Sequence, residues 1–316
     1  MKEKILVIAP QFLGDGILSV PFFRNLRLHY KDAQIDAITK NAGKLVLDRV
    51  PYINNVYDLK NITKSFIRKQ KYKKVYILKR SLSAMMLVLG CGIKQKIGFS
   101  GQFRKPFLSK PVKYKANQKH EIEHFFDILR SDGIEIVDNN LEYFVLDEAC
   151  KSVQKHLSEC KKALLVPCAS TKVKQWSNEN FAKVAEFLLE QGYSVYFLGL
   201  KSEKAYCDSI AKGEGIYNLC GKLSFDESVA LVSQMDLAVG IDSGFCHLAS
   251  AFEVKTLTLF GPMSPLQWGL WGEQTKNFWL GLPCSPCKKP KKCKINFECM
   301  QKITPENVLS NLSDMI

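Results

Sequence analysis

The chain alternates between short apolar runs and longer segments whose apolar residues recur every three to four positions. In the first half the short runs lie at residues 4–10, 34–39, 75–78 and 97–99, and they are typical of strands buried in a parallel sheet. Residues 17–30 and 120–131 have helical spacing, and Gly133 follows the second segment as a stop signal. Repeated strand–helix–strand units predict a parallel sheet with helices on both faces.

A second series of the same kind begins near residue 163. Its predicted strands lie at residues 163–167, 193–199, 237–240 and 256–260. Its helices are predicted from Ser177 to about Gln191, over residues 203–211, after the capping box of Ser224 and Glu227, and from Thr304 onward. Segment 150–162 is interpreted as a connecting helix, so the sequence predicts two doubly wound α/β domains, residues 1–155 and 156–316.

The composition is that of an ordinary folded protein, with 316 residues, 46% hydrophobic and 24% charged. It excludes disordered, collagenous and small disulfide-linked proteins. No apolar run reaches the ~18–20 residues that cross a bilayer, and the N-terminus enters a strand without the cleavage site of a secretion signal. Eleven cysteines, an odd number, fit a reducing compartment. These features predict a soluble cytoplasmic protein.

The positive charge is concentrated in the first half of the chain. Residues 1–150 carry +11 and residues 151–316 carry +3 of the net +14. Residues 60–119 hold 17 Lys and Arg and no Asp or Glu, with aromatic residues between them. Such a segment is either a solvated face or a surface for a polyanion, and its length and confinement favour the anion surface.

The first chemical motif is FLGDGILSVP, residues 12–21, directly after the first strand. A carboxylate at the carboxyl end of a parallel strand is where open α/β sheets place catalytic groups, so Asp15 is a candidate. Asp15 is alternatively a helix N-cap. The glycines also resemble a dinucleotide fingerprint, but Ser19 replaces the third glycine and the turn is too long, which argues against NAD.

Two further motifs follow strands of the second half. In PCASTKVKQWS, residues 167–177, hydroxyls, backbone N–H groups and lysines can hold a phosphate, and Trp176 is interpreted as a packing residue. In GIDSGFCHLASA, residues 240–251, Ser243 and Gly244 open a helix whose N-terminus favours an anion, and His247 lies one turn further. Taken alone, His247 is more often a structural histidine, but its place beside Asp242-Ser243-Gly244 favours a contact with the same phosphate.

Four cysteines lie within sixteen residues near the C-terminus: Cys284, Cys287, Cys293 and Cys299. Thiols at such spacing either ligate a structural zinc or remain free or partly disulfide-linked. Because the last two spacings differ from the usual paired CxxC pattern, the sequence favours thiols without a metal.

These motifs resemble, in the right order, those of glycosyltransferase family 9, the ADP-heptose:lipopolysaccharide heptosyltransferases of Gram-negative bacteria. The resemblance runs from residue 5 to about 310 and rests on Leu13-Gly-Asp15, Lys174-x-Trp176, Asp242-Ser-Gly-x-x-His247 and Phe260-Gly-Pro262. Ser177 stands where many members have proline, and segment 60–119 carries no family motif. The family implies a GT-B fold, two Rossmann-like domains facing a central cleft, with the acceptor on residues 1–155 and the nucleotide sugar on residues 156–316.

The resemblance also implies roles for individual residues. Asp15 becomes the catalytic base. Glu203 is assigned to the ribose of the donor. The donor diphosphate is assigned to one set of residues in the second domain: Ser170, Thr171, Lys174, Asp242, Ser243, Gly244 and His247. No metal cofactor is implied, and the sequence contains no clustered Asp-x-Asp motif, which agrees.

The resemblance therefore implies an inverting, metal-independent transfer of heptose from ADP-heptose to a Kdo-lipid A type acceptor at the cytoplasmic face of the inner membrane. The basic pairs Arg68/Lys69 and Arg104/Lys105 are the candidates for binding that anionic glycolipid. An alternative is a GT-B enzyme with another nucleotide sugar or glycan acceptor. A nucleic-acid-binding protein is a further alternative, but the chain lacks a recognisable nucleic-acid motif, so no nucleic-acid partner is expected.

Overall fold

The computed structural model describes residues 2–168, 171–210, 212–287 and 293–316. The chain forms two compact units, Met1–Phe144 and Val145–Ile316. The division precedes the expected boundary at residue 155 because helix α7 (Asp147–Val153) belongs to the second unit. Its Ala149 and Val153 pack against Ala230 of α10 (Phe225–Val232), and Ser152 Oγ donates a hydrogen bond to Glu227.

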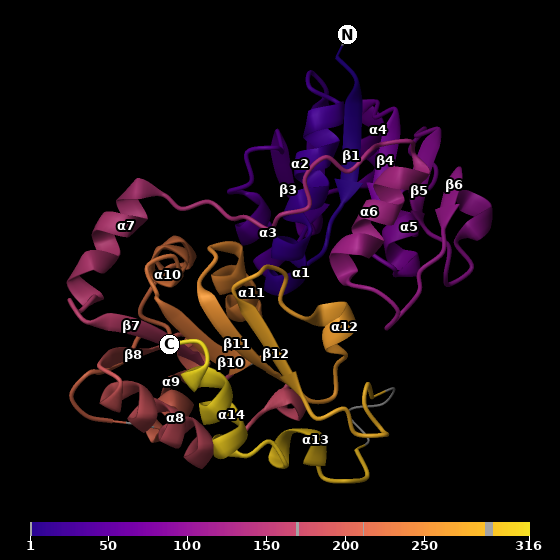
Figure 1. Cartoon of the computed structure of the whole chain (residues 1–316). Helices are drawn as coiled ribbons and strands as arrows, with labels where there is room; N and C mark the ends of the chain where they lie inside the picture. Colours follow the sequence, from indigo (N-terminus) through magenta and orange to yellow (C-terminus); the bar gives the residue numbers. More distant parts are fainter. Residues whose placement is uncertain (1, 169–170, 211, 288–292) are drawn as a thin grey trace. The chain divides into compact units, whose positions relative to one another are not determined.

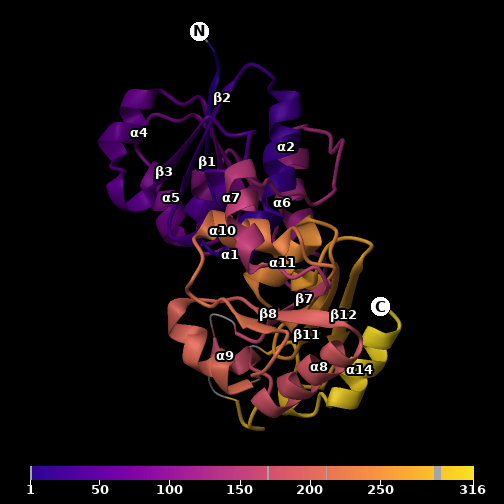
Figure 2. The same ribbon diagram turned by 90° about the vertical axis from the view of Figure 1, so that its left-hand side faces the viewer.

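The first unit is a six-stranded parallel sheet with the strand order β3-β2-β1-β4-β5-β6. Its strands are β1 Lys4–Ile8, β2 Gln34–Thr39, β3 Asn55–Asp58, β4 Lys74–Ile77, β5 Gln95–Phe99 and β6 Lys110–Val112. Its helices are α1 Leu13–Leu18, α2 Val20–His29, α3 Ala42–Leu47, α4 Lys64–Gln70, α5 Leu82–Val88 and α6 Glu121–Ser131, with short 3₁₀ turns at Leu59–Asn61 and Lys105–Phe107. Helices α2 and α6 cover one face of this sheet, and α4 and α5 cover the other (Figure 2).

The second unit is also a six-stranded parallel sheet, with the order β12-β11-β10-β7-β8-β9. Its strands are β7 Lys161–Val166, β8 Tyr193–Phe197, β9 Ile216–Asn218, β10 Leu237–Ile241, β11 Lys255–Phe260 and β12 Thr275–Trp279. Besides α7 and α10, its helices are α8 Asn178–Glu190, α9 Lys204–Ile210, α11 Gly244–Ala251, α12 Pro265–Trp268, α13 Glu298–Gln301 and α14 Pro305–Ser313. Three 3₁₀ turns lie at Gln154–His156, Lys172–Lys174 and Lys201–Glu203. Helices α8 and α14 lie on one face of the sheet and α10 and α11 on the other (Figure 1).

Both sheets have the same connectivity. Read in chain order, each has the strand order 3-2-1-4-5-6 of a Rossmann-like fold. The direction of winding reverses between β1 and β4 in the first unit and between β7 and β10 in the second. Ligands of open α/β sheets bind outside the carboxyl ends of the strands at such a reversal, so these two places are where functional residues are expected.

The predicted helix over residues 17–30 is two helices, and this prediction was wrong in its boundaries. Helix α1 begins at Leu13 and α2 begins at Val20, with Ser19 between them. Ser19 Oγ donates to the Gly16 carbonyl oxygen at 2.7 Å, and Pro21, which has no N–H group, starts the first turn of α2. The earlier start places Asp15 inside a helix rather than on the turn before it.

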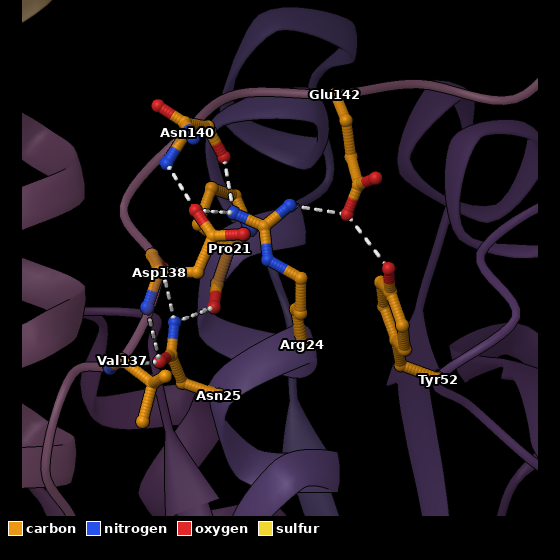
Figure 3. A network of polar contacts seen from close by, with 8 residues as sticks. All are labelled: Pro21, Arg24, Asn25, Tyr52, Val137, Asp138, Asn140 and Glu142. Carbon is orange, nitrogen blue, oxygen red and sulfur yellow. Dashed lines mark hydrogen bonds and ion pairs between the residues drawn. The ribbon is translucent and has the colours of Figure 1, made fainter.

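A polar network attaches the last segment of the first unit to α2 (Figure 3). Arg24, only 7% exposed, makes ion pairs with Glu142 and with Asp138, the latter at 2.9 Å. Asn25 Nδ2 donates to the Asp138 carbonyl oxygen at 2.6 Å, and its Oδ1 accepts from Val137 N at 2.8 Å. These contacts fix the otherwise irregular segment 137–142, because its backbone groups find partners there instead of in a strand.

Within the described ranges, no helix is long and apolar enough to cross a membrane.

Candidate functional site

Asp15 lies in the first turn of α1, close to the carboxyl end of β1. The N-cap of this helix is Phe12, so the alternative role of Asp15 as the N-cap was wrong. Its backbone is fixed because Gly16 N donates to Phe12 O at 2.9 Å and Ser19 N donates to Asp15 O at 3.1 Å. Asp15 as a whole residue is half-buried. The helical backbone of α1 therefore fixes the position of Asp15 near the place where the strand order reverses, between β1 and β4.

Strand β4 ends beside β1, since Ile8 pairs with Ile77. Two cations follow it. Lys79 Nζ donates to Gln11 Oε1 at 3.1 Å, and burial, together with the charge of Lys40, lowers the pKa of Lys79. The Arg80 guanidinium lies over the Tyr114 ring at 4.2 Å. No local motif of the sequence marks Lys79, Arg80 or Tyr114, because their positions depend on the pairing of strands, such as β4 with β1, and not on neighbouring residues.

A cavity of about 300 Å³ opens at the same strand ends. Its walls are mostly aliphatic, with two lysine side chains among them: Ile8, Leu59, Lys64, Lys79, Ser83, Ala84, Met86 and Leu87. A pocket with apolar walls and a few cations suits an amphipathic anion.

The two basic pairs expected to bind an acceptor differ in exposure. Arg68, Lys69 and Lys105 are exposed, and Arg68 donates to the Gly90 carbonyl oxygen at 3.2 Å. Arg104, the fourth member of these pairs, is only 1% exposed, so its side chain is not on the surface as those of the other three are. It donates to the carbonyl oxygens of Gly101 at 2.9 Å and Lys79 at 2.7 Å. Burial and then the charge of Arg80 lower the pKa of Arg104.

In the second unit, the loops after β7 and β10 meet as expected from the motifs. Lys174 Nζ pairs with Asp242 Oδ2 at 2.7 Å and donates to the Asp242 carbonyl oxygen at 3.3 Å. Burial raises the pKa of the Asp242 carboxyl, while the Lys174 charge opposes that rise. Thr171 is exposed, and its carbonyl oxygen accepts a hydrogen bond from Lys174 N at 3.3 Å. Ser170 lies outside the described residues. The β7/β10 reversal thus carries a nearly buried ion pair.

Helix α11 begins directly after this ion pair. Its N-cap is Ser243, in extended conformation, and Gly244 is its first residue. The N–H groups of a first helical turn have no partner within the helix, so this end favours an anion. A Cβ at Gly240 would lie 2.8 Å from Cys246 Sγ and from the Val166 carbonyl oxygen, so glycine permits this close packing. His247 is 4% exposed.

Glu203 lies in the 3₁₀ turn after β8, and its Oε2 accepts a hydrogen bond from Leu200 N at 2.7 Å. One carboxylate oxygen is thus engaged with the backbone. The packing role expected for Trp176 is confirmed, since it is 2% exposed and its Nε1 donates to the Ile303 carbonyl oxygen at 2.8 Å.

A family model confirms what the motifs and the fold suggest. Residues 62–296, most of the chain, match the model of glycosyltransferase family 9 (heptosyltransferase). The protein belongs to glycosyltransferase family 9. It is therefore a glycosyltransferase, and the resemblance stated from the sequence is confirmed.

Individual heptosyltransferases match most of the chain. The lipooligosaccharide heptosyltransferase 2 of Campylobacter jejuni is 26% identical, over 99% of this chain and 98% of its own. The lipopolysaccharide heptosyltransferase 3 of Escherichia coli is 27% identical, over 86% of each. The solved E. coli ADP-heptose lps heptosyltransferase II superposes with a TM-score of 0.82 and 22% identity, over 100% of this chain and 98% of that one. The predicted GT-B fold is confirmed.

The four C-terminal cysteines of this family 9 chain line one small cavity of about 20 Å³, together with Pro262, Ser285, Ile295 and Phe297. Cys299 is buried, and burial and then the neighbouring thiols raise its pKa. In the part of the chain that the structure describes, no group of three or more His, Cys, Asp or Glu has the arrangement of a metal site.

Proposed function

We propose that the protein transfers a heptose from ADP-heptose to the inner core of a Kdo-lipid A type acceptor, with inversion and without a metal. The observation that supports this proposal best is that, in a family 9 chain, both places where the strand order reverses carry candidate functional residues. One carries the Asp15 carboxylate, and the other carries Lys174 and Asp242 beside the N-terminus of α11. The relatives named above are heptosyltransferases, and one is named for ADP-heptose.

The second unit is assigned to the donor. Ser170, Thr171 and Lys174 are assigned to a diphosphate in this proposal, and Ser243, the first-turn N–H groups from Gly244 onward and His247 are assigned to the same site. Asp242 holds the Lys174 ammonium by their 2.7 Å ion pair, and Glu203 is assigned to the ribose. Fixed N–H groups and a lysine stabilise the negative charge that grows on the leaving ADP, as a metal does in other transferases.

The first unit is assigned to the acceptor. Asp15 accepts the proton of the acceptor hydroxyl as its oxygen forms a bond to the anomeric carbon. The bond from that carbon to the diphosphate breaks, and ADP leaves with the electron pair. Because the oxygen attacks from the side opposite ADP, a single displacement inverts the anomeric configuration. Arg68, Lys69 and Lys105 supply positive charge for the anionic glycolipid.

Peripheral binding to the cytoplasmic face of the inner membrane is part of the proposal. Phe103 is 92% exposed and Phe107 is 41% exposed, on either side of Arg104 and Lys105 in the segment without acidic residues. Aromatic rings with neighbouring lysines are the combination by which peripheral proteins bind anionic bilayers.

The double variant Phe103→Ser/Phe107→Ser is expected to bind vesicles that contain phosphatidylglycerol at least about tenfold more weakly than the wild type, because each ring buried in lipid contributes roughly 1.5–3 kcal/mol. Co-sedimentation measures this. Val137→Ser is the matched control, since Val137 is 72% exposed in the same unit but outside the basic segment. Equal vesicle binding by the double variant and the wild type would remove this surface from the proposal.

Lys174→Ala is expected to weaken ADP binding by about tenfold to a hundredfold, since a hydrogen bond to a charged group contributes about 1.5–3 kcal/mol. Calorimetric titration measures the affinity, and Lys183→Ala, which removes an exposed lysine from α8, is the control. If Lys174→Ala binds ADP normally but melts earlier, Lys174 serves only to compensate the buried Asp242 charge.

A thermal-shift panel tests the class of ligand. The transferase proposal predicts that ADP raises the melting temperature more than UDP or GDP does, because a ligand stabilises the state that binds it. Stabilisation by UDP or GDP instead favours the alternative of another nucleotide sugar. Stabilisation by oligonucleotides and not by ADP contradicts the proposal and favours the nucleic-acid-binding alternative.

A further inference from the structure

Arg80 forms the outer end of a stack of planar side chains in the first unit. Its guanidinium lies 4.2 Å from the Tyr114 ring centroid, and the Tyr114 ring stacks on His124 at 4.0 Å with an interplanar angle of 26°. Phe99 meets Tyr114 edge-on at 5.0 Å. Arg80 is exposed, whereas His124 is 0% exposed. The stack holds one arginine at a defined place at the end of β4.

The members beneath Arg80 are uncharged at neutral pH. Tyr114 donates its hydroxyl hydrogen to Glu121, in the first turn of α6. Burial raises the pKa of Tyr114, and the charge of Glu121 raises it further. Burial, followed by the charge of Lys119, lowers the pKa of His124 to about 4. Arg80 therefore supplies the positive charge of the stack.

A second guanidinium lies next to Arg80. Arg104 donates to the carbonyl oxygen of Lys79, the residue directly before Arg80. Its Nη2 atom is buried and has no hydrogen-bond partner among the described residues. Within the same ranges, the Arg80 guanidinium makes no hydrogen bond or ion pair with an acidic side chain. Two neighbouring like charges raise each other's energy, and a bound anion would lower it.

We propose that Arg80 binds an anionic group of the acceptor, a carboxylate or a phosphate, and is thereby a specificity-determining residue, with Arg104 as a positioning residue behind it. This inference rests on the proposed function. A guanidinium suits either group because its planar fork donates two parallel hydrogen bonds to an oxyanion.

The place of Arg80 relative to Asp15 supports this assignment. Strands β1 and β4 are adjacent in the sheet, and Asp15 follows one while Arg80 follows the other. Both charges act on Tyr114, with opposite effects on its pKa. An acceptor whose anionic group is held by Arg80 would have its hydroxyls fixed within the neighbourhood of Asp15, so loss of Arg80 affects acceptor binding before it affects proton transfer.

The test compares Arg80→Gln with Arg80→Lys and with Arg130→Gln. The control removes an exposed guanidinium of α6, which pairs with Glu123. Arg80→Gln is expected to weaken acceptor binding to the ADP-bound protein by about tenfold to a hundredfold, the range for charge-assisted hydrogen bonds. Arg80→Lys recovers part of the loss because one ammonium cannot form the paired bonds. ADP affinity and melting temperature stay unchanged, since Arg80 is exposed and lies in the other unit from the donor residues.

Acceptor analogues distinguish the two anions. In one analogue the carboxyl group is converted to an amide, and in the other the phosphates are removed. The analogue that lacks the group bound by Arg80 should bind the wild type and Arg80→Gln with equal affinity. The inference is overturned if Arg80→Gln binds the acceptor as tightly as the wild type does. It is also overturned if the variant binds every analogue, including an uncharged one, more weakly by the same factor. Because binding is measured by titration without turnover, it is independent of transfer. Failure to transfer heptose contradicts the proposed function but leaves the binding result interpretable.

Discussion

Asp15→Asn is expected to lower kcat by about 10²–10⁴-fold, the usual contribution of a general base. A sugar hydroxyl is a poor nucleophile at neutral pH, and asparagine cannot accept its proton. The backbone of α1 should not change, because the N-cap is Phe12 and the bonds of Gly16 and Ser19 in this turn are made by the main chain. Steady-state kinetics with saturating donor and acceptor measure the loss.

Two controls show whether the loss is chemical. ADP affinity should stay within about threefold of the wild type, a difference below 1 kcal/mol, because the residues assigned to the donor lie in the second unit. The free energy of unfolding should fall by no more than about 1 kcal/mol, the contribution of a carboxylate in a first helical turn. Near-normal turnover of Asp15→Asn would refute the base assignment, and a large loss of stability would make Asp15 a structural residue.

Asp132→Ala should lower the free energy of unfolding by about 3–5 kcal/mol, because it leaves a buried lysine without its counter-ion. Asp132 is 3% and Lys74 is 7% exposed at their side chains, and the two form an ion pair. Tyr76 also donates to Asp132 Oδ2 at 2.6 Å, and Lys110 Nζ lies 2.7 Å from Oδ1. Denaturant unfolding followed in the wild type and the variant measures the difference.

Asp127→Ala is the matched control, since Asp127 belongs to α6 and its partners Lys119 and Arg130 are partly exposed. It should cost no more than about 1 kcal/mol, as exposed ion pairs do. A similarly small loss in Asp132→Ala would show that Lys74 finds water or another partner.

The same ion pair predicts a dependence of stability on pH. Burial alone would raise the pKa of Asp132, but hydrogen bonds from Lys110, Lys74 and Tyr76 outweigh it and lower the pKa. The stabilisation by Asp132 is therefore complete above the ordinary carboxyl pKa of about 4 and is lost as the pH falls through the lowered value. The free energy of unfolding should fall less steeply below pH 4 in Asp132→Ala than in the wild type.

Elements with strong local signals could be predicted from the sequence. The strand at residues 34–39 has the predicted bounds, and Ser177 and Ser224 cap α8 and α10 through their hydroxyls. These features depend on neighbouring residues alone, on an apolar run or on a cap a few positions away. The carboxylate motif after β1 and the two phosphate-site motifs after β7 and β10 also consist of neighbouring residues, so they could be found in the sequence.

The edge strands could not be predicted in the same way. Strands β3, β6 and β9 are three or four residues long and only partly buried, so they lack an apolar run. Their hydrogen bonds to a neighbouring strand define them, and those partners lie far away in the chain. The break at Ser19 is similar, because an apolar periodicity continues through it.

Contacts between side chains that lie far apart in the chain could not be predicted from the sequence either. Arg104 reads as a surface charge in a basic segment, yet it is buried because the Lys79 carbonyl oxygen and the adjoining turn accept its hydrogen bonds. Asp132 pairs with a lysine 58 positions earlier. A charged residue is exposed in most cases, so a local charge pattern predicts exposure. Which individual charged side chains are buried depends on the topology of the sheet.

Incubating the purified protein with ADP-heptose and a Kdo-bearing lipid A acceptor, with a metal chelator present, tests the central claim most directly. Mass spectrometry and NMR of the product give the mass added and the anomeric configuration. We predict one heptosyl residue added per acceptor, release of one equivalent of ADP and inversion at the anomeric carbon. No product from ADP-heptose by folded protein that binds ADP, or transfer from a UDP- or GDP-linked sugar instead, would contradict it.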